Sequence, residues 1–411
     1  MKRKHFVGSA LSVAFLGGTG ASALAQVAGA ASPLPSFGTS VDPDNVLVVV
    51  QMGGGNDGLN TIVPWSDDAY HRVRPAIRVA ETQVLKLNDR IGLNPALKGL
   101  NEIYKQGRVA LVQGVGYPNP NRSHFEATQI WETASPDRPQ QYGWLGRYLD
   151  KRFSGRAKPA SMFEAVSLGD TLPAALVASH VEVPAIGAIN AFGYNTGRDL
   201  ASKQSAGVLY DGAKPGQSPY LAMIAQTARD AYHGGDVLRK QTAEFTNKAA
   251  YPANPFAQQL ALAAKLIGSS ASSKIVFVSI GSFDTHAGQP AQQDRLLGYL
   301  GDGLLAFYTD LVAHGLDKKV LTMTFSEFGR RVAQNASNGT DHGAAMPLFV
   351  LGGGVKGGIY GEHPSLTDLD RNGDLKFATD FRAVYATVIE KWLGRNPADV
   401  LTGAYPSLAF V

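Results

Sequence analysis

Residues 46–60 read VLVVVQMGGGNDGLN, and this stretch decides the fold. It begins with an apolar, β-branched run that is too short for a helix of ordinary length and has no polar alternation. Such a run is typical of a central parallel strand that is covered on both faces. Ligands of open α/β sheets bind just beyond the carboxyl ends of such strands. Asp57, in a glycine-rich turn at that end, is therefore a candidate site residue, although Asn-Asp-Gly also forms ordinary solvated turns.

The composition is that of a globular protein. The chain has 411 residues, of which 44% are hydrophobic and 18% are charged, so disordered and fibrous classes are excluded. It contains no cysteine. The chain therefore has no disulfide, no thiol nucleophile and no thiolate metal ligand, and its stability has to come from a large core.

The first 25 residues have the pattern of an export signal. Lys2-Arg3-Lys4 is basic, residues 6–17 are apolar, and Ala23-Leu24-Ala25 is a cleavage site. The apolar run is too short to span a bilayer, and no other segment is predicted to do so. Residues 3–7 resemble a twin-arginine signal with one lysine, which leaves Sec and Tat export open. We expect a periplasmic or secreted protein.

Cleavage of this signal changes the charge balance. It would remove three basic residues and leave 35 basic against 34 acidic side chains. A nearly neutral mature chain argues against a nucleic-acid partner. We expect residues 26–45 to form a linker and residues 46–411 to form a single domain, with a cap or insertion around residues 150–270.

Strand and helix patterns alternate through this domain, which predicts an α/β fold with a mostly parallel central sheet. Further buried strands are predicted at residues 108–114, 274–280, 319–325 and 347–351. Helices are predicted at residues 94–107, 218–248, 254–268, 296–316 and 380–393.

The exit of the second strand leads to a helix that begins near Ser123. Ser123 and Glu126 have the spacing of a capping box, so Ser123 can be read as a structural cap. The same hydroxyl, at a helix N-terminus that stabilises anions, is also suited to be a nucleophile toward a phosphoryl or sulfuryl group. Arg122 is then a candidate anion binder, and His124 a candidate base or metal ligand.

Carboxylate and imidazole groups follow the remaining strands. They are Asp284 with His286, Glu327, and Asp341 with His342. Each pairing alone is common by chance, but several strand exits would deliver such groups to one end of the sheet. Crowded carboxylates repel one another, so the cluster implies bound cations. Arg330 and Arg331, with Arg122, are available to neutralise a bound anion.

A D-x-D-x-N-G run lies within Thr367–Asp374 and invites a calcium-loop reading. It has Thr379 where an EF-hand requires a bidentate glutamate, so a polar β-turn is favoured. Neither glycine run has the spacing of a P-loop or a dinucleotide fingerprint, and no nucleotide cofactor is predicted.

Five motifs in this order resemble the DUF1501 family of exported bacterial proteins: GGGNDGLN, NRSHFEA, FDTHAGQ, FSEFGRR and TDHG. That family is placed in the alkaline phosphatase/sulfatase superfamily. The resemblance covers about residues 46–394 and implies a three-layer α/β/α sandwich of the alkaline phosphatase type, with metal ligands at strand ends.

The resemblance also implies a distribution of ligands over two cations. Asp57, Asp341 and His342 would bind one cation, and Asp284 with His286 the second, while Ser123 would be the nucleophile. Zinc is the expected metal, with manganese, magnesium or calcium as alternatives.

Three features depart from the superfamily pattern. Asp284 and His286 lie closer together in the chain than the corresponding ligands usually do. The third ligand of that metal could be His363 or Glu327. Pro118 stands where the modified residue of a formylglycine sulfatase belongs, which excludes that chemistry.

The sequence therefore predicts an exported metal-dependent hydrolase of phosphate, phosphonate or sulfate esters, acting on a small-molecule or polymer-borne substrate. The alternative is a secreted, non-catalytic binding or cell-surface assembly protein on a degenerate hydrolase scaffold. Neither the substrate nor the oligomeric state follows from the sequence.

Overall fold

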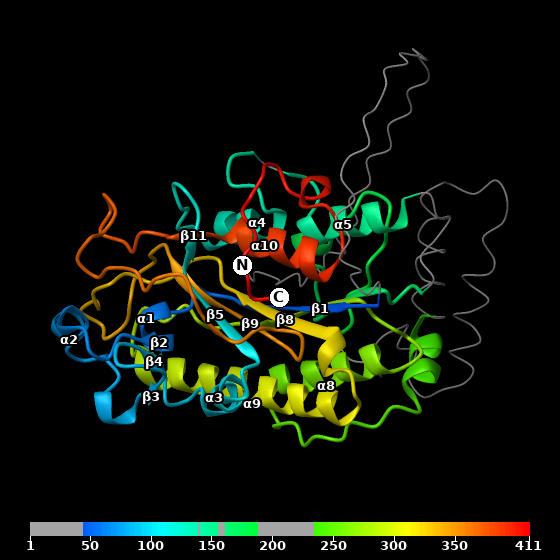
Figure 1. Cartoon of the computed structure of the whole chain (residues 1–411), viewed down its shortest axis with the longest axis horizontal. Helices are drawn as coiled ribbons and strands as arrows, with labels where there is room; N and C mark the ends of the chain where they lie inside the picture. The colour runs from blue at the N-terminus through cyan, green and yellow to red at the C-terminus, as the bar shows by residue number, and fades with distance from the viewer. Residues whose placement is uncertain (1–43, 139, 155–160, 188–233) are drawn as a thin grey trace, which may run out of the picture. The chain divides into compact units, whose positions relative to one another are not determined.

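β1 (Val46–Met52) is an interior strand of the main sheet, between β7 (Ile275–Ile280) and β8 (Val320–Phe325) (Figure 1). It pairs in parallel with both neighbours; Val48, for example, faces Val276 on one side and Thr322 on the other. Its apolar side chains are buried on both faces of the sheet. The prediction of a central parallel strand is confirmed.

This computed structural model describes residues 44–138, 140–154, 161–187 and 234–411. The described residues fall in one unit of the chain, residues 40–411. The predicted export signal, most of the linker and the first part of the helix predicted at 218–248 lie outside the described residues.

The main sheet has the strand order β10-β5-β9-β8-β1-β7-β6, and β11 pairs with β5. β9 runs antiparallel between β5 and β8, while the other pairings are parallel. The sheet is therefore mostly parallel, as predicted. Its remaining strands are β5 (Val109–Gly116), β6 (Ala165–Leu168), β9 (Met346–Leu351), β10 (Gly358–Tyr360) and β11 (Thr379–Asp380).

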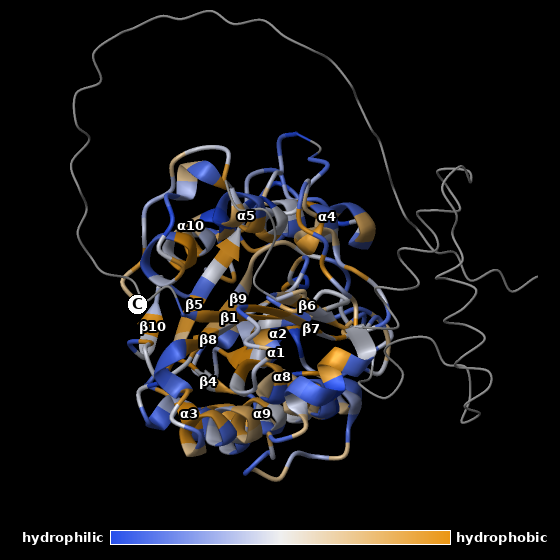
Figure 2. Ribbon diagram, turned by 90° about the vertical axis from the view of Figure 1, so that its right-hand side faces the viewer, coloured by the Kyte–Doolittle hydropathy of each residue, from blue (hydrophilic) through white to orange (hydrophobic). Residues whose placement is uncertain are grey.

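Helices cover both faces of this sheet and complete three layers (Figures 1 and 2). Val48 and Val50 pack with α3 (Lys98–Lys105), α8 (Pro255–Gly268) and α9 (Gln289–Ala313). Leu47 and Val49 belong to a second core cluster on the other face. That cluster contains residues of α4 (His124–Thr133), α5 (Trp144–Phe153) and α10 (Phe381–Thr387). Strand side chains alternate between the two cores because their period is two. The three-layer α/β/α architecture is confirmed.

A small antiparallel sheet and several short helices lie between the main elements. The sheet has the order β2-β4-β3. Its strands and the neighbouring helices are β2 (Ile62–Val63), β3 (Leu85–Lys86), β4 (Gly92–Leu93), α1 (Gly58–Thr61) and α2 (Asp68–Val73). The remaining turns of helix are η1 (Glu81–Gln83), η2 (Ala174–Leu176), η3 (Asp317–Lys319), the π-helix η4 (Val388–Trp392) and η5 (Pro397–Asp399).

Helix α9 is the one described helix that is long and apolar enough to cross a membrane, judged by length and composition alone. It is largely buried, and its apolar side chains, among them Leu297, Leu300 and Phe307, belong to a core cluster. A core helix of this length satisfies the same criterion, so α9 is weak evidence for a membrane span.

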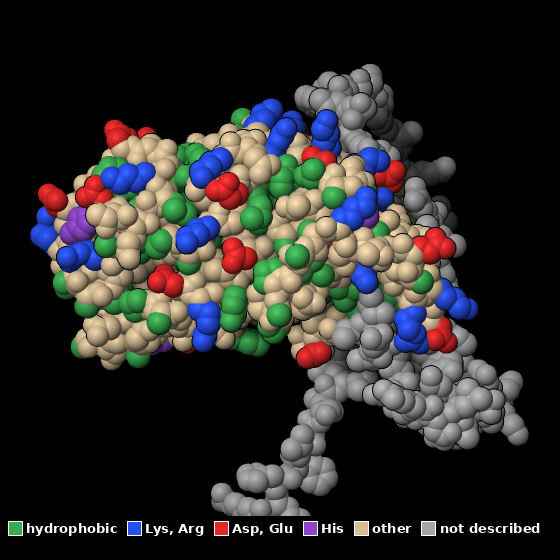
Figure 3. All heavy atoms as spheres, turned by 90° about the horizontal axis from the view of Figure 1, so that it is seen from below, with side chains coloured by type: hydrophobic (Ala, Val, Ile, Leu, Met, Phe, Trp, Pro, Cys, Tyr) green, Lys and Arg blue, Asp and Glu red, His purple; other side chains and the backbone are tan. Residues whose placement is uncertain are grey.

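The surface seen from below in Figure 3 carries Lys and Arg interspersed with Asp and Glu. Neither sign of charge dominates that face.

Some boundaries differ from the predictions. Helix α9 begins at Gln289, seven residues before the predicted start, because Pro290 is favourable in the first helical turn. The described part of the helix predicted at 218–248 is helical only over residues 234–242. β6 and α8, both within the region expected to form a cap, belong to the main sheet and to one of its covering layers.

Candidate metal centre

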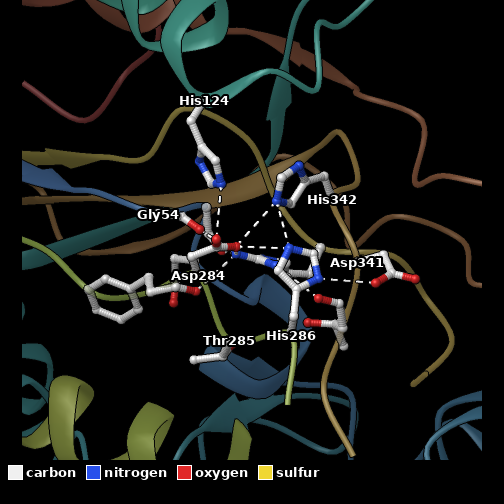
Figure 4. A network of polar contacts seen from close by, with 12 residues as sticks. Gly54, His124, Asp284, Thr285, His286, Asp341 and His342 are labelled. Atoms are coloured by element: carbon white, nitrogen blue, oxygen red, sulfur yellow. Dashed lines mark hydrogen bonds and ion pairs between the residues drawn. The ribbon is translucent and has the colours of Figure 1, made fainter. Parts of the chain in front are cut away.

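Four segments meet beyond the carboxyl ends of the strands and bring the predicted polar residues together (Figure 4). Asp284 and His286 follow β7, and Glu327 follows β8. His124 is the first residue of α4, whereas His342 lies in the loop that leads to β9. The side chains of His124, Asp284, His286 and His342 point toward one another in this view.

The carboxylate of Asp284 lies at the centre of the group. Its Oδ1 accepts a hydrogen bond of 2.6 Å from Nη2 of Arg330. Burial by itself would raise the pKa of Asp284, but the hydrogen bond from Arg330 and its positive charge outweigh burial and lower this pKa to about 2. Asp284 is therefore an anion throughout the physiological pH range.

Each of the three histidines points its Nδ1 at an acceptor outside the centre. Nδ1 of His342 lies 2.8 Å from the carbonyl oxygen of Arg122, which can only accept. Nδ1 of His124 lies 2.8 Å from Oε1 of Glu327, and Nδ1 of His286 lies 3.1 Å from Oδ1 of Asp341. We therefore assign the proton of each neutral ring to Nδ1, which leaves the lone pair on Nε2.

The three Nε2 atoms converge on Asp284. Nε2 of His286 and Nε2 of His342 are 2.9 Å apart and lie 3.0 and 3.2 Å from Oδ1 of Asp284. Nε2 of His124 lies 3.4 Å from Oδ2 of the same carboxylate. Lone pairs at these separations repel one another unless a cation lies between them.

The spacing of these atoms fits a small divalent metal. Zinc–nitrogen bonds of about 2.0–2.1 Å in a tetrahedron place neighbouring ligand atoms roughly 3.3 Å apart, close to the 2.9–3.4 Å separations here. His124, Asp284 and His342 each offer one ligand atom, and these atoms lie within 4.8 Å of one another. In addition, Nε2 of His124 is buried and has no hydrogen-bond partner among the described residues. These two imidazoles and one carboxylate are a donor set that fits zinc, and Nε2 of His286 lies beside it, 2.9 Å from Nε2 of His342.

Burial also favours the neutral imidazole that metal binding needs. It lowers the pKa of His342, against the opposing effect of the hydrogen bond to the carbonyl oxygen of Arg122. Behind His286, hydrogen bonds from Asn335 and from His286 itself lower the pKa of Asp341. Ionised carboxylates that accept the Nδ1 proton of a ligating histidine fix its ring orientation.

Arg330 joins the loops that form the centre. It is 1% exposed and donates to Asp284, to the carbonyl oxygens of Gly54, Gly55 and Phe283, and to that of Thr340. The N–H groups of its guanidinium thus donate to acceptors of the protein itself. The prediction that Arg330 serves as an anion binder stays a prediction, and its contacts do not favour it.

Gly54 allows two of these loops to touch. Its φ is +114°, and a Cβ on it would lie 2.5 Å from the backbone nitrogen of Asp284. Its N–H donates to Oε1 of Glu327 over 2.8 Å. Only glycine tolerates this conformation and this close approach, so the glycine-rich turn positions Glu327 and Asp284.

Ser123 is the N-cap residue of α4, as predicted, but its side chain makes no capping hydrogen bond. The capping box does not form because Asn121 replaces it: Oδ1 of Asn121 accepts from the N–H of Ser123, and its Nδ2 donates to Glu126. The Ser123 side chain is exposed. Its hydroxyl stays available beside His124.

The other two predicted arginines flank Asp374. Arg122 forms an ion pair with Oδ2 of Asp374, a fully buried carboxylate, and Nε of Arg331 lies 3.8 Å from its Oδ1. Asp374 closes the turn predicted at 367–374: Asp370 accepts from the N–H groups of Asn372 and Asp374, and Leu369 bridges Leu375. The predicted polar turn is confirmed.

Asp57 lies outside this group. It is fully buried, and its carboxylate forms a 2.6 Å ion pair with Arg74, which is also fully buried. It also accepts from Gln289 and from the N–H of Leu59. Its oxygens are thus occupied by donors of the protein. The ligand role predicted for Asp57 stays a prediction that these contacts do not favour.

The structure therefore groups the predicted residues around one point rather than in two separate ligand sets. Glu327 and Asp341 contact His124 and His286 through the outer ring nitrogens. His363 is not in the group, and its Nδ1 contacts the carbonyl oxygen of Pro364. The third imidazole is instead His124, which the sequence indicated as a base or ligand.

Three comparisons place the chain among known proteins. The model of the family described as "Protein of unknown function (DUF1501)" matches residues 113–402. This range includes every residue of the centre except Gly54 and Gly55. None of the curated proteins matches the chain.

Several solved structures share part of the backbone arrangement. The zinc complex of the C-terminal periplasmic domain of EptC from Escherichia coli is 8% identical, with a TM-score of 0.35, over 77% of this chain and 76% of that chain. The lipoteichoic acid synthase LtaP from Listeria monocytogenes is 10% identical, with a TM-score of 0.33, over 79% and 70%. The sulfatase PsFucS1 from Pseudoalteromonas sp. is 11% identical, with a TM-score of 0.36, over 88% and 73%. At these scores, function has to be argued from the centre itself.

Proposed function

The chain belongs to the DUF1501 family, and from that premise we propose that it is an exported metal-dependent hydrolase of phosphate, phosphonate or sulfate esters. One observation carries the proposal. Three histidines turn Nδ1 toward acceptors outside the centre and Nε2 toward one anionic carboxylate. A bound divalent cation would polarise an ester oxygen and stabilise negative charge on it.

In this proposal the chain's own residues hold and orient that cation. His124, His286, His342 and Asp284 are the ligands. Glu327, Asp341 and the Arg122 carbonyl keep the three rings in the required tautomer. Zinc is the first candidate, and manganese, magnesium and calcium follow because their preferred ligands are oxygen-rich.

Ser123 is the proposed nucleophile. It lies in the chain between Arg122, whose carbonyl holds His342, and His124, a proposed ligand. The Ser123 oxygen would bond to phosphorus or sulfur as the bond to the leaving alcohol breaks, with its proton passing to solvent. Water would then release the acid and restore the hydroxyl. The N-terminus of α4 stabilises the anionic oxygens during both steps.

The test combines metal analysis with a substrate panel of aryl phosphate, aryl phosphonate and aryl sulfate. We expect metal in the purified protein and turnover of at least one ester class. Ser123→Ala should retain the metal and lose at least a hundredfold in kcat. If Ser123→Ala is fully active while Asp284→Ala is inactive, the nucleophile assignment is wrong and water attacks directly. A metal-free protein, inert on every ester, would contradict the proposal and favour the non-catalytic alternative.

A further inference from the structure

A large cavity opens directly beside the metal centre. Its volume is about 690 Å³, which is enough for an organic group of drug size. Four segments of the chain line the cavity, here called its walls, and three of them also contribute residues to the centre. Pro120 precedes Ser123 by three residues, Phe328 follows Glu327, and Ala344 follows His342 by two residues.

Phe328 separates the cavity from the metal centre. Its ring lies 4.9 Å from the ring of His124 and 4.6 Å from that of His342, measured between centroids. Phe328 also lines the cavity. The cavity therefore lies one aromatic ring away from two proposed ligands, within reach of the organic group of an ester held at the centre.

The walls of the cavity combine aromatic rings with positive charge. Tyr117, Trp131 and Phe377 line it together with Phe328. Tyr117, Trp131 and Phe328 are at most 3% exposed, so a ligand ring would stack on Phe377 rather than on them. Phe377 is 37% exposed and offers the most accessible ring surface of the four.

The positive charge comes from the 369–377 segment, which forms the fourth wall and contributes Arg371 and Lys376 to the lining. Lys376 is paired with Asp368, whereas Arg371 is exposed and makes no ion pair with any residue that the structure describes. Asp370 also lines the cavity, but its Oδ1 already accepts two backbone N–H groups. Arg371 is thus the cation that faces a ligand in this wall.

The fourth wall is fixed to the metal centre through Arg122. The guanidinium of Arg122 binds Asp374 in this wall, and the carbonyl oxygen of the same residue accepts from His342. One residue therefore links the 369–377 segment to a proposed metal ligand.

We propose that this cavity binds the organic group of the ester and selects an aromatic ring that carries a negative charge, with the ring against Phe377 and the charge at Arg371. This inference rests on the proposed function for the identity of the ester. The recognition of the ring and of its charge is a property of the cavity itself and is measurable without turnover.

The test uses two probes of equal size, 4-hydroxybenzoate and its neutral counterpart 4-hydroxybenzamide, titrated calorimetrically into the purified full chain. We expect the benzoate to bind about fivefold more tightly, the size of a partly exposed charge pair. Arg371→Ala should bring the two affinities within about twofold of each other and leave benzamide binding unchanged. Phe377→Ala should weaken both probes by the same factor.

The control is Arg295→Ala, which removes an exposed arginine of α9 and should change neither affinity. Equal binding of the two probes to the wild-type protein, or an equal loss of both in Arg371→Ala, would overturn the inference. The same titration on Asp284→Ala separates the two proposals. If this variant still binds the benzoate more tightly than the benzamide, the proposed ring and charge recognition by the cavity is supported even if metal and turnover prove absent. In an active enzyme, Arg371→Ala should raise KM for a carboxylated aryl ester and leave kcat unchanged.

Discussion

Asp57 and Asp284 follow two neighbouring strands of one sheet, but their surroundings are opposite. Asp57 is fully buried and receives hydrogen bonds from Arg74, Gln289 and Leu59. The side chain of Asp284 is 44% exposed and faces one arginine and three Nε2 atoms that carry lone pairs. Two aspartates at strand ends can therefore have different surroundings: those of Asp284 suit a metal ligand, whereas the oxygens of Asp57 are occupied by donors of the protein.

The largest expected effect concerns Asp284. Asp284→Asn should lower bound metal from about one ion per chain to near zero and reduce ester turnover at least a thousandfold, since one ligand and the central charge are lost. Metal content by mass spectrometry and kcat on the responsive ester measure both effects. Asp89→Asn, at an exposed position, is the control. Full metal content in Asp284→Asn would show that Asp284 is not a required metal ligand and does not differ from Asp57 in this respect.

The reverse behaviour is expected for Asp57. Asp57→Asn should lower the free energy of unfolding by about 3–5 kcal/mol, because Arg74 is left as an uncompensated buried charge. Metal content of the folded fraction should not change. Urea unfolding measures the loss.

Asp67→Asn is the matched control for Asp57→Asn. Asp67 caps α2 through the N–H of Ala69, as Asp57 caps α1, but it is only partly buried. Asparagine caps a helix nearly as well as aspartate, so this change should cost less than about 1 kcal/mol. If the two variants lose equal stability, the buried ion pair contributes nothing.

A buried carboxyl that has no basic partner among the described residues extends the comparison to a third case. Glu132 of α4 is 5% exposed, and burial raises its pKa from 4.5 to about 7, although the N–H groups of Ala175 and Ala174 oppose the shift. Between pH 4.5 and 7 the unfolded chain loses this proton while the folded chain keeps it. Stability should therefore fall as the pH rises, by roughly 3 kcal/mol over this window.

Urea unfolding at pH 5 and pH 7.5 tests this pH dependence. Glu132→Gln should remove that part of the decline and be more stable than the wild-type protein at pH 7.5. An identical pH dependence in Glu132→Gln would show that Glu132 is ionised in the folded protein.

The smallest effects are expected behind the histidines. Glu327→Gln and Asp341→Asn remove the charge that accepts an Nδ1 proton, which typically weakens metal binding about 10–100-fold. Glu327 is 2% exposed and also accepts a hydrogen bond from the N–H of Gly54, so Glu327→Gln should weaken metal binding by about 100-fold. The side chain of Asp341 is 56% exposed, so Asp341→Asn should weaken metal binding by only about 10-fold. Competition with a chelator measures both, and direct metal ligation by either residue would appear as a much larger loss.

The strands were predictable because they are buried on both faces. A short apolar run of β-branched residues bounded by turn residues is typical of a buried strand. β5, β7, β8 and β9 lie within two residues of their predicted limits, and β1 begins at Val46, where the predicted run begins. β6 was missed because Ala165–Leu168 is short and is followed by a Gly- and Pro-containing stretch. β6 is stabilised by its parallel pairing with β7, a tertiary contact that cannot be read from its own sequence.

The members of the metal centre were predictable, but their grouping was not. Side-chain type and strand-end position indicated His124, Asp284, His286 and His342. Which nitrogen of each ring faces inward depends on an acceptor brought by another loop, as with the Arg122 carbonyl and His342. Arg74, the partner of Asp57, lies 17 residues away and has no sequence signal that connects the two.

Arg330 gives the centre a further property. It holds carbonyl oxygens of the loops after β1 and β7 and of Thr340, so it touches segments made early and late during synthesis. Until residue 342 has left the ribosome, neither Arg330 nor His342 can complete the cluster, and a nascent chain has only scattered histidines. Metal binding would therefore report that the chain has been made and folded at least as far as His342, and a chain that ends before this residue would lack the complete cluster.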